Sequence, residues 1–148
     1  MPQRDTERAV AQAATLESAR AATGAPAAAG TGSADPVAGE LRRAGILPLL
    51  VLHLLADGRS YGNSLIERIA DVSDGLLVVN PNTMYPLLRD LEARGLVAGE
   101  WEHPERRSRR FYALTDAGAT ERDRLRSDVA PRLDAVARAV GRLREELA

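Results

Sequence analysis

The stretch NPNTMYPLLRDLEARGL, residues 80–96, decides the predicted fold. Large apolar residues recur in it at intervals of three and four, which predicts an amphipathic helix ended by Gly95. The inner stripe of this helix consists of Met84, Leu87, Leu88 and Leu91. Its opposite face carries polar and bulky groups near the helix entry: Asn82, Thr83, Tyr85, Pro86 and Arg89. Such an entry indicates that the inner face of the helix packs in the core and that its opposite face is a binding surface.

The start of this helix has two readings. Asn80 followed by Pro81 makes a good N-cap and first position, but it leaves Pro86 inside the helix, where its ring removes a backbone hydrogen bond. A start at Thr83 keeps Pro86 in the tolerated first turn. We therefore predict the later start.

The flanking sequence predicts two earlier helices and a later hairpin. ELRRAGILPLLVLHLLADG (40–58) is expected to form a first helix ended by Gly58, and SYGNSLIERIAD (60–71) a second helix capped by Ser60. LVAGEWE (96–102) and RRFYALT (109–115) alternate with period two around HPERRS, which predicts a two-stranded ribbon. Three helices followed by a ribbon make a winged helix-turn-helix, so the fold class is mainly α with a small β hairpin.

The two ends of the chain differ from this central part. Residues 1–37 form an arm rich in Ala, Gly and Thr that has almost nothing to bury, so we expect it to be flexible. Residues 38–114 are the winged helix-turn-helix domain. Residues 115–148 predict a helix capped by Thr115 and bent at Pro131. Its apolar residues have the spacing of a coiled-coil seam, which predicts dimerisation through Leu125, Val129, Leu133, Val136, Val140 and Leu143.

Composition excludes several classes of function. The chain has 148 residues, a formal net charge of −1 and no cysteine, which excludes disulfides, thiolate zinc sites and thiol catalysis. Its two histidines have no acidic cluster beside them, and a glycine-rich phosphate loop is lacking, so we expect no enzyme, no metal and no cofactor. The longest apolar run is far below the about 20 residues of a membrane span. We therefore expect a cytoplasmic protein with no membrane partner.

Arginines gather in the predicted hairpin, although the whole chain is nearly neutral. HPERRSRR (103–110) sets Arg106, Arg107, Arg109 and Arg110 against Glu105. Guanidinium groups there could pair with phosphates or enter a minor groove, and the alternative is a solvated polar hairpin. We favour an anionic partner, with double-stranded DNA as the candidate.

The neighbouring helix entry has matching chemistry. Arg89 could reach a guanine edge or a phosphate, and Asn82 and Thr83 lie at a helix N-terminus, where the helix dipole favours phosphate. Tyr85 offers a hydroxyl to a backbone phosphate. The alternatives are that Tyr85 is a core aromatic and that Thr83 is a simple helix cap. For each residue taken singly, the structural interpretation explains the sequence as well as DNA binding does.

These motifs resemble the PadR family of bacterial transcriptional regulators. The family pattern T-x-Y-P-x-L, then L-E-x-x-G-L, then R-x-Y-x-L-T-x-x-G, appears here from Thr83 to Leu88, from Leu91 to Leu96 and from Arg110 to Gly118. The resemblance covers about residues 41–120 closely and the last helix loosely. Tyr61-Gly62-Asn63 stands where many members have His-Gly-Tyr, which we interpret as a packing variation.

The resemblance implies a homodimeric DNA-binding protein, usually a repressor, that recognises an operator with dyad symmetry. It implies DNA contacts by Thr83, Tyr85, Arg89 and the hairpin arginines. Because some relatives hold flat hydrophobic effectors between subunits, it also suggests a small hydrophobic effector. The alternative function is a winged-helix module that binds protein and not DNA.

Overall fold

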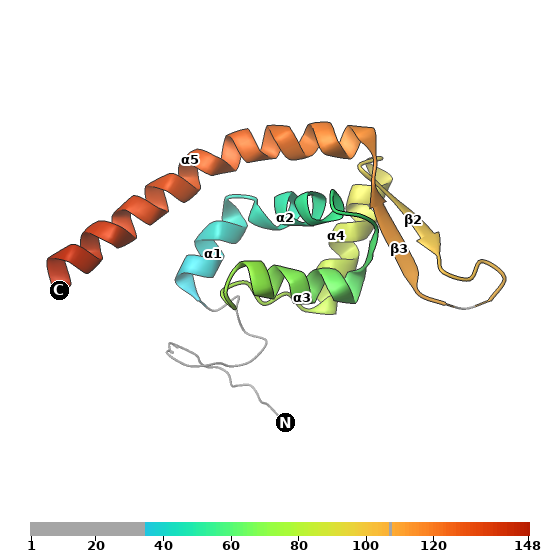
Figure 1. The fold of residues 1–148 in the computed structure, drawn as a ribbon, viewed down its shortest axis with the longest axis horizontal. Helices are drawn as coiled ribbons and strands as arrows, with labels where there is room; N and C mark the ends of the chain where they lie inside the picture. The colour runs from blue at the N-terminus through green and yellow to red at the C-terminus, as the bar shows by residue number, and fades with distance from the viewer. Residues whose placement is uncertain (1–34, 107) are drawn as a thin grey trace, which may run out of the picture.

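The computed structural model describes residues 35–106 and 108–148, so the arm expected at residues 1–37 lies almost entirely outside the described residues. The described chain is mostly helical with a small antiparallel sheet, as predicted. In Figure 1, α1 to α4 form a helical body, the β2–β3 hairpin projects from it, and α5 crosses the body and continues beyond it. The elements in order are α1 (Pro36–Arg43), α2 (Ile46–Leu55), β1 (Ser60–Tyr61), α3 (Gly62–Val72), α4 (Pro81–Ala93), β2 (Val97–Trp101), β3 (Arg110–Leu114) and α5 (Asp116–Leu147).

The single first helix expected from residues 40–58 is wrong, because the structure has two helices there. Asp35 caps α1 by accepting hydrogen bonds from the backbone N–H groups of Val37 and Ala38. The chain then turns at Gly45, whose φ of 93° lies in the left-handed region that favours glycine. Pro48 falls in the first turn of α2, where its missing N–H costs no helical bond.

The expected two-stranded ribbon is a three-stranded sheet in the described chain. Ser60, predicted as a helix cap, instead begins the short strand β1, and α3 follows with Tyr61 at its N-cap position. The strand order is β1-β3-β2, with Ser60 opposite Tyr112 and Tyr61 opposite Phe111. This pairing connects the entry of α3 directly to strand β3 of the hairpin.

Helix α4 starts earlier than predicted. It begins at Pro81, with the Asn80 side chain accepting the N–H of Thr83 at 3.1 Å, and Pro86 lies inside the helix. The preference for a start at Thr83 is therefore wrong. The Asn80 cap and the fixed φ of Pro81 favour the earlier start, and they offset the single helical bond that Pro86 removes.

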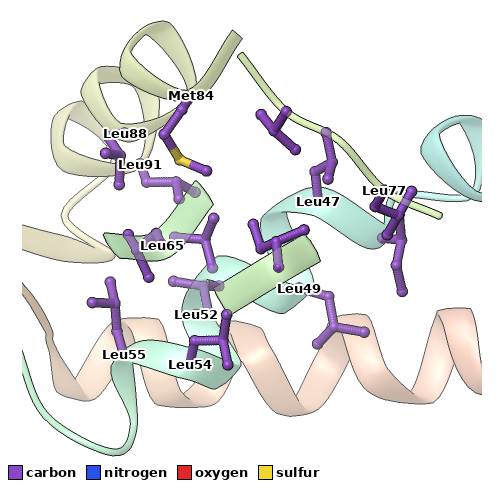
Figure 2. Close-up of a cluster of buried hydrophobic side chains, with 14 of the residues drawn as sticks. Leu47, Leu49, Leu52, Leu54, Leu55, Leu65, Leu77, Met84, Leu88 and Leu91 are labelled. Atoms are coloured by element: carbon purple, nitrogen blue, oxygen red, sulfur yellow. The ribbon is translucent and has the colours of Figure 1, made fainter. Parts of the chain in front are cut away.

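The core lies between α2, α3 and α4 and is built from leucines (Figure 2). Met84, Leu88 and Leu91 on the inner face of α4 are fully buried and contact the same cluster as Leu52 and Leu65. Leu87 is partly buried beside them. The predicted inner stripe of α4 is thereby confirmed, and its opposite face is left to solvent.

Helix α5 has two halves with different surroundings. Thr115 caps it as predicted, accepting the N–H of Gly118 at 3.0 Å. Val129 is 1% exposed in the core of its own chain, and Leu125 packs against that core. These two residues, expected in a dimer seam, therefore pack within one subunit, since a partner has almost nothing left to bury on Val129.

The second half of α5 follows Pro131, and Figure 1 shows the helix bending and running clear of the body. Arg132 pairs with Glu40 of α1 near this point, and Arg132 is the main cause that lowers the pKa of Glu40. Large apolar side chains are exposed beyond it: Leu133, Val140, Leu143 and Leu147. Across the part of the chain that the structure describes, no helix has the length and apolar character needed to cross a membrane.

Candidate nucleic-acid interface

The outward face of α4 presents the side chains expected at a binding surface. Asn82 and Arg89 are exposed, while Thr83 and Tyr85 are partly buried. Arg89 has no ion pair with any residue of 35–106 or 108–148. This face therefore offers one unneutralised guanidinium beside polar groups at a helix entry.

Tyr85 is held in place by the start of α3. Its hydroxyl donates a hydrogen bond to Oδ1 of Asn63 at 3.2 Å. Its ring lies on Gly62, where an added β-carbon would approach Cε1 of Tyr85 to 2.7 Å. The interpretation of Tyr61-Gly62-Asn63 as a packing variation is therefore incomplete, because Gly62 and Asn63 position a candidate site residue. The hydroxyl stays near the surface, so Tyr85 is not a wholly buried core aromatic.

A hollow of about 560 Å³ lies between α3, α4 and the hairpin. It is lined by Asn63 and Ser64 of α3, Tyr85 and Arg89 of α4, and Arg109 and Arg110 of the hairpin segment. The outward face of α4 and the loop end of the hairpin strands thus face the same space, although they are separate in the sequence.

Arg109 is held against Tyr61 and Glu102 where the hairpin strands meet the loop. Its guanidinium lies 3.8 Å from the ring centroid of Tyr61, and Nη2 donates to the Tyr61 hydroxyl at 3.0 Å and to Glu102 at 3.4 Å. The Tyr61 hydroxyl in turn donates to Oε2 of Glu102 at 2.9 Å. Desolvation, followed by this bond to Glu102, raises the pKa of Tyr61, so the hydroxyl keeps its proton.

Arg110 is held still more firmly against the body. Its Nη2 donates to Oε2 of Glu92 at 2.9 Å, and its guanidinium lies over the rings of Trp101 and Tyr112. Its Nε is buried and finds no hydrogen-bond partner among the described residues. The side chain points inward from β3 to α4 and leaves little of its charge at the surface.

The cluster of hairpin arginines expected from the sequence is therefore divided. Arg106 is exposed near the tip, Arg107 lies outside the described residues, and Arg109 and Arg110 are paired with carboxylates where the strands meet the loop. From the sequence, only Glu105 was set against these arginines. Glu102 could have been found, because the hairpin pattern places it opposite Arg109, and the N–H of Glu102 indeed donates to the Arg109 carbonyl at 2.7 Å. Glu92 has no such signal, because it is on a different element.

The Glu102 carboxyl should titrate below its ordinary pKa of 4.5, first because it accepts the Tyr61 hydroxyl and then because Arg109 is beside it. A carboxyl whose folded pKa is depressed stabilises the fold above its unfolded pKa, and this contribution disappears as the pH falls through the folded pKa. We expect carboxyl NMR to show a low midpoint that Tyr61→Phe moves upward. Tyr85→Phe, which leaves the Tyr61–Glu102 bond intact, should not change it. An unchanged midpoint in Tyr61→Phe would show that this bond is not the main cause.

Metal ligation has no basis in residues 35–106 and 108–148, where no group of three His, Asp or Glu side chains could hold an ion. The arrangement on this face consists of guanidiniums, amides and hydroxyls around a hollow, together with the Glu92 carboxylate that pairs with Arg110. Guanidiniums, amides and hydroxyls bind anions by charge and hydrogen bonds.

Comparison with known proteins assigns the fold and the motifs to one group. A family model described as "Transcriptional regulator PadR-like family" matches residues 51–124. Transcriptional regulator Rv3488 of Mycobacterium tuberculosis is 38% identical over 79 residues, which are 53% of this chain and 70% of that protein.

Solved structures agree. A PadR family transcriptional regulator from Eggerthella lenta is 38% identical, with a TM-score of 0.51 over 72% of this chain and 87% of the other. A transcriptional regulator from Clostridium thermocellum, at 20% identity and a TM-score of 0.55 over 70% of this chain and 96% of the other, shows a shared fold. Members of the matched family are regulators and not enzymes. With half of its length matched by the family model, this chain belongs to the PadR-like family of transcriptional regulators.

Proposed function

We propose that this regulator binds double-stranded DNA through α4 and the hairpin, and that it acts as a homodimeric repressor on a dyad-symmetric operator. The observation that carries the proposal is that Arg89 and Tyr85 on α4 border the same hollow as the loop end of the hairpin strands. A duplex laid against this face would meet both features at once. Its phosphates would be attracted to the local guanidiniums of Arg89 and the hairpin, because the chain as a whole is nearly neutral and exerts no general attraction on a polyanion.

Within this proposal, α4 enters the major groove. Arg89 reaches a base edge or a phosphate, and Asn82 and Thr83 lie at the helix N-terminus, where backbone phosphates are favoured. Tyr85 presents its hydroxyl to the sugar-phosphate backbone. At the hairpin tip, Arg106 contacts the flanking backbone, while Arg109 and Arg110 lie closer to the protein body. A DNA contact by Arg107, which lies outside the described residues, stays a prediction from the sequence.

The exposed second half of α5 supports the dimer. Val140 and Leu143 are 45% and 60% exposed, and a second copy of this helix would cover them together with Leu133 and Val136. Two α4 helices related by a two-fold axis would read half-sites about one helical turn, 34–36 Å, apart. Release by a small hydrophobic effector held between subunits stays a prediction.

Salt dependence tests the phosphate contacts. We expect the logarithm of the association constant for the duplex upstream of the protein's own gene to fall linearly with the logarithm of salt concentration. Arg89→Ala and Arg106→Ala should each lower the size of this slope by about 1 per subunit if each side chain neutralises one phosphate. Fluorescence anisotropy at several salt concentrations measures it.

Arg138→Ala provides a matched control, because Arg138 is exposed on the second half of α5, away from α4 and the hairpin. It should leave the slope unchanged. A flat salt response of the wild-type protein, or DNA affinity untouched when the hairpin arginines are all changed to Ala, would favour the protein-binding module instead.

A further inference from the structure

Glu92 on α4 contacts both strands of the hairpin. Its Oε2 accepts a hydrogen bond from Nη2 of Arg110 on β3 at 2.9 Å and another from the backbone N–H of Gly99 on β2 at 3.2 Å. The side chains of Glu92 and Arg110 are only 33% and 31% exposed. One partly buried carboxylate therefore joins the helix that carries Arg89 to the hairpin that carries Arg106.

Gly99 provides the room for this contact. A β-carbon at Gly99 would lie 2.9 Å from Oε2 of Glu92 and closer still to Nη2 of Arg110. Any other residue would push the ion pair apart, so Glu92, Gly99 and Arg110 act as one unit, called here the Glu92 bridge. The sheet pairs β1 with β3 at two positions only, with Ser60 opposite Tyr112 and Tyr61 opposite Phe111. The Glu92 bridge adds a tie from α4 to both strands.

The Glu92 bridge also changes the role expected of Arg110. Glu92 neutralises its charge, and the guanidinium is 5.2 Å from the Trp101 ring centroid and 5.7 Å from that of Tyr112. To contact a phosphate, Arg110 would have to leave the carboxylate and both rings. These contacts hold it toward the protein body.

We propose that Glu92 and Arg110 are positioning residues that set the angle between the hairpin and α4, so that the hairpin tip and Arg89 meet the same duplex. The inference rests on the proposed function and deepens it. It means that the Glu92 carboxylate favours DNA binding, although this carboxylate lies in a surface that faces a polyanion.

The sign of one substitution separates positioning from simple electrostatics. Glu92→Gln removes a negative charge from the DNA-facing side, and it also frees Arg110, so electrostatics alone predicts tighter binding. Positioning predicts weaker binding, because a neutral amide holds the guanidinium less firmly and the hairpin angle is no longer fixed. We expect an affinity loss of about three- to tenfold, as for a partly buried charge-assisted contact.

The experiment compares three variants of the full chain on the same duplex by fluorescence anisotropy. Glu92→Gln changes the charge, and Gly99→Ala displaces the ion pair without changing any charge, so both should weaken binding. Asp90→Asn is the matched control, because Asp90 is an exposed carboxylate on α4 whose hydrogen bond and ion pair among the described residues are with Arg94 of its own segment and not with the hairpin. It should leave binding unchanged or slightly tighter.

Trp101 supplies a readout that does not depend on DNA. It is the only tryptophan of the chain, and the Arg110 guanidinium lies over its ring. Its fluorescence emission should shift in Glu92→Gln and Gly99→Ala but not in Asp90→Asn. Far-UV circular dichroism identifies any variant that fails to fold, and Glu92→Gln, which adds no volume, decides the matter if Gly99→Ala does fail.

The possible failures are distinguishable. Tighter or unchanged DNA binding by folded Glu92→Gln would overturn the positioning role while leaving the proposed function intact. A wild-type protein without salt-dependent DNA binding would overturn both. An unshifted Trp101 emission in Glu92→Gln would mean that the Glu92 bridge does not hold Arg110 against this ring, and it too would overturn the inference.

Discussion

Gly118→Ala is expected to lower the free energy of unfolding by about 2–4 kcal/mol. The added methyl group overpacks the junction, and the shift that it forces breaks the helix cap. Gly118 lies in the first turn of α5, and an added β-carbon would collide with the backbone carbonyl oxygen of Leu96 and approach Cδ1 of Leu114 to 2.7 Å. The same junction holds the bond from the Thr115 hydroxyl to the Gly95 carbonyl at 2.7 Å. Backbone on both sides would have to shift. Urea unfolding followed by circular dichroism measures the effect.

Gly141→Ala is the matched control in the same helix. A β-carbon at Gly141 meets nothing within 4 Å, and alanine is the better helix former by about 1 kcal/mol. Its stability should stay equal or rise. Equal stability of Gly118→Ala and wild type would mean that the α5 entry and the turn after α4 are more loosely packed than the structure indicates.

The second large effect concerns pairing of subunits. Val140→Glu together with Leu143→Glu should give a monomer, because the exposed apolar face of α5 would then carry carboxylates that repel their copies across the two-fold axis. Since a monomer engages one half-site at a time, the affinity for a two-half-site operator should fall by about 100-fold or more. Light scattering after size-exclusion chromatography gives the mass, and anisotropy gives the affinity.

Arg138→Glu together with Arg142→Glu tests whether charge alone explains such a result. These two exposed arginines lie on the opposite side of the same half of α5, and their replacement changes the net charge more than the seam variant does. We expect this control to remain dimeric. A seam variant that still elutes as a dimer would contradict the assignment of Val140 and Leu143 to the interface.

Elements with a strong hydrophobic period could be predicted from the sequence. The inner stripe of α4 is buried as expected, and both hairpin strands lie where alternation placed them. The break at Gly45 was missed, because apolar residues continue on both sides of it and the glycine alone does not separate a break from a continuous helix. Strand β1 has two residues and is too short for any period to appear.

Local rules also competed at the start of α4. Pro86 inside the helix removes a backbone hydrogen bond, whereas Asn80 followed by Pro81 favours an early helix start. The structure begins α4 at Pro81, so the second effect is the larger one. At α5, heptad spacing continues through Leu125 and Val129, but spacing alone does not tell whether the neighbour of a stripe is a partner or the same chain. Only the position of α2 under this half of the helix decides it.

The chemistry of the candidate site was partly predictable. Arg89, Tyr85 and the tip arginine Arg106 were predicted from composition and helix position, and the structure places Arg89 and Tyr85 at the hollow and exposes Arg106. The neutralisation of Arg110 by Glu92 was not, because the two residues are 18 positions apart and on different elements. Because Arg106, Arg109 and Arg110 are close in the sequence, a shared role at the hairpin tip was expected. In the structure, carboxylates hold Arg109 and Arg110 against the protein, and this separates them from Arg106.

The continuity of α5 has a consequence for how this architecture can vary. Its first half is fixed to α2 through Val129, and its exposed apolar face begins at Leu133 on the same helix. One residue inserted between them would rotate the apolar face by about 100° around the helix axis and move it by about 1.5 Å. In the proposed dimer, insertions or deletions there would thus swing one head around the other, and only steps close to a whole number of helical turns would keep both heads on one side of a duplex.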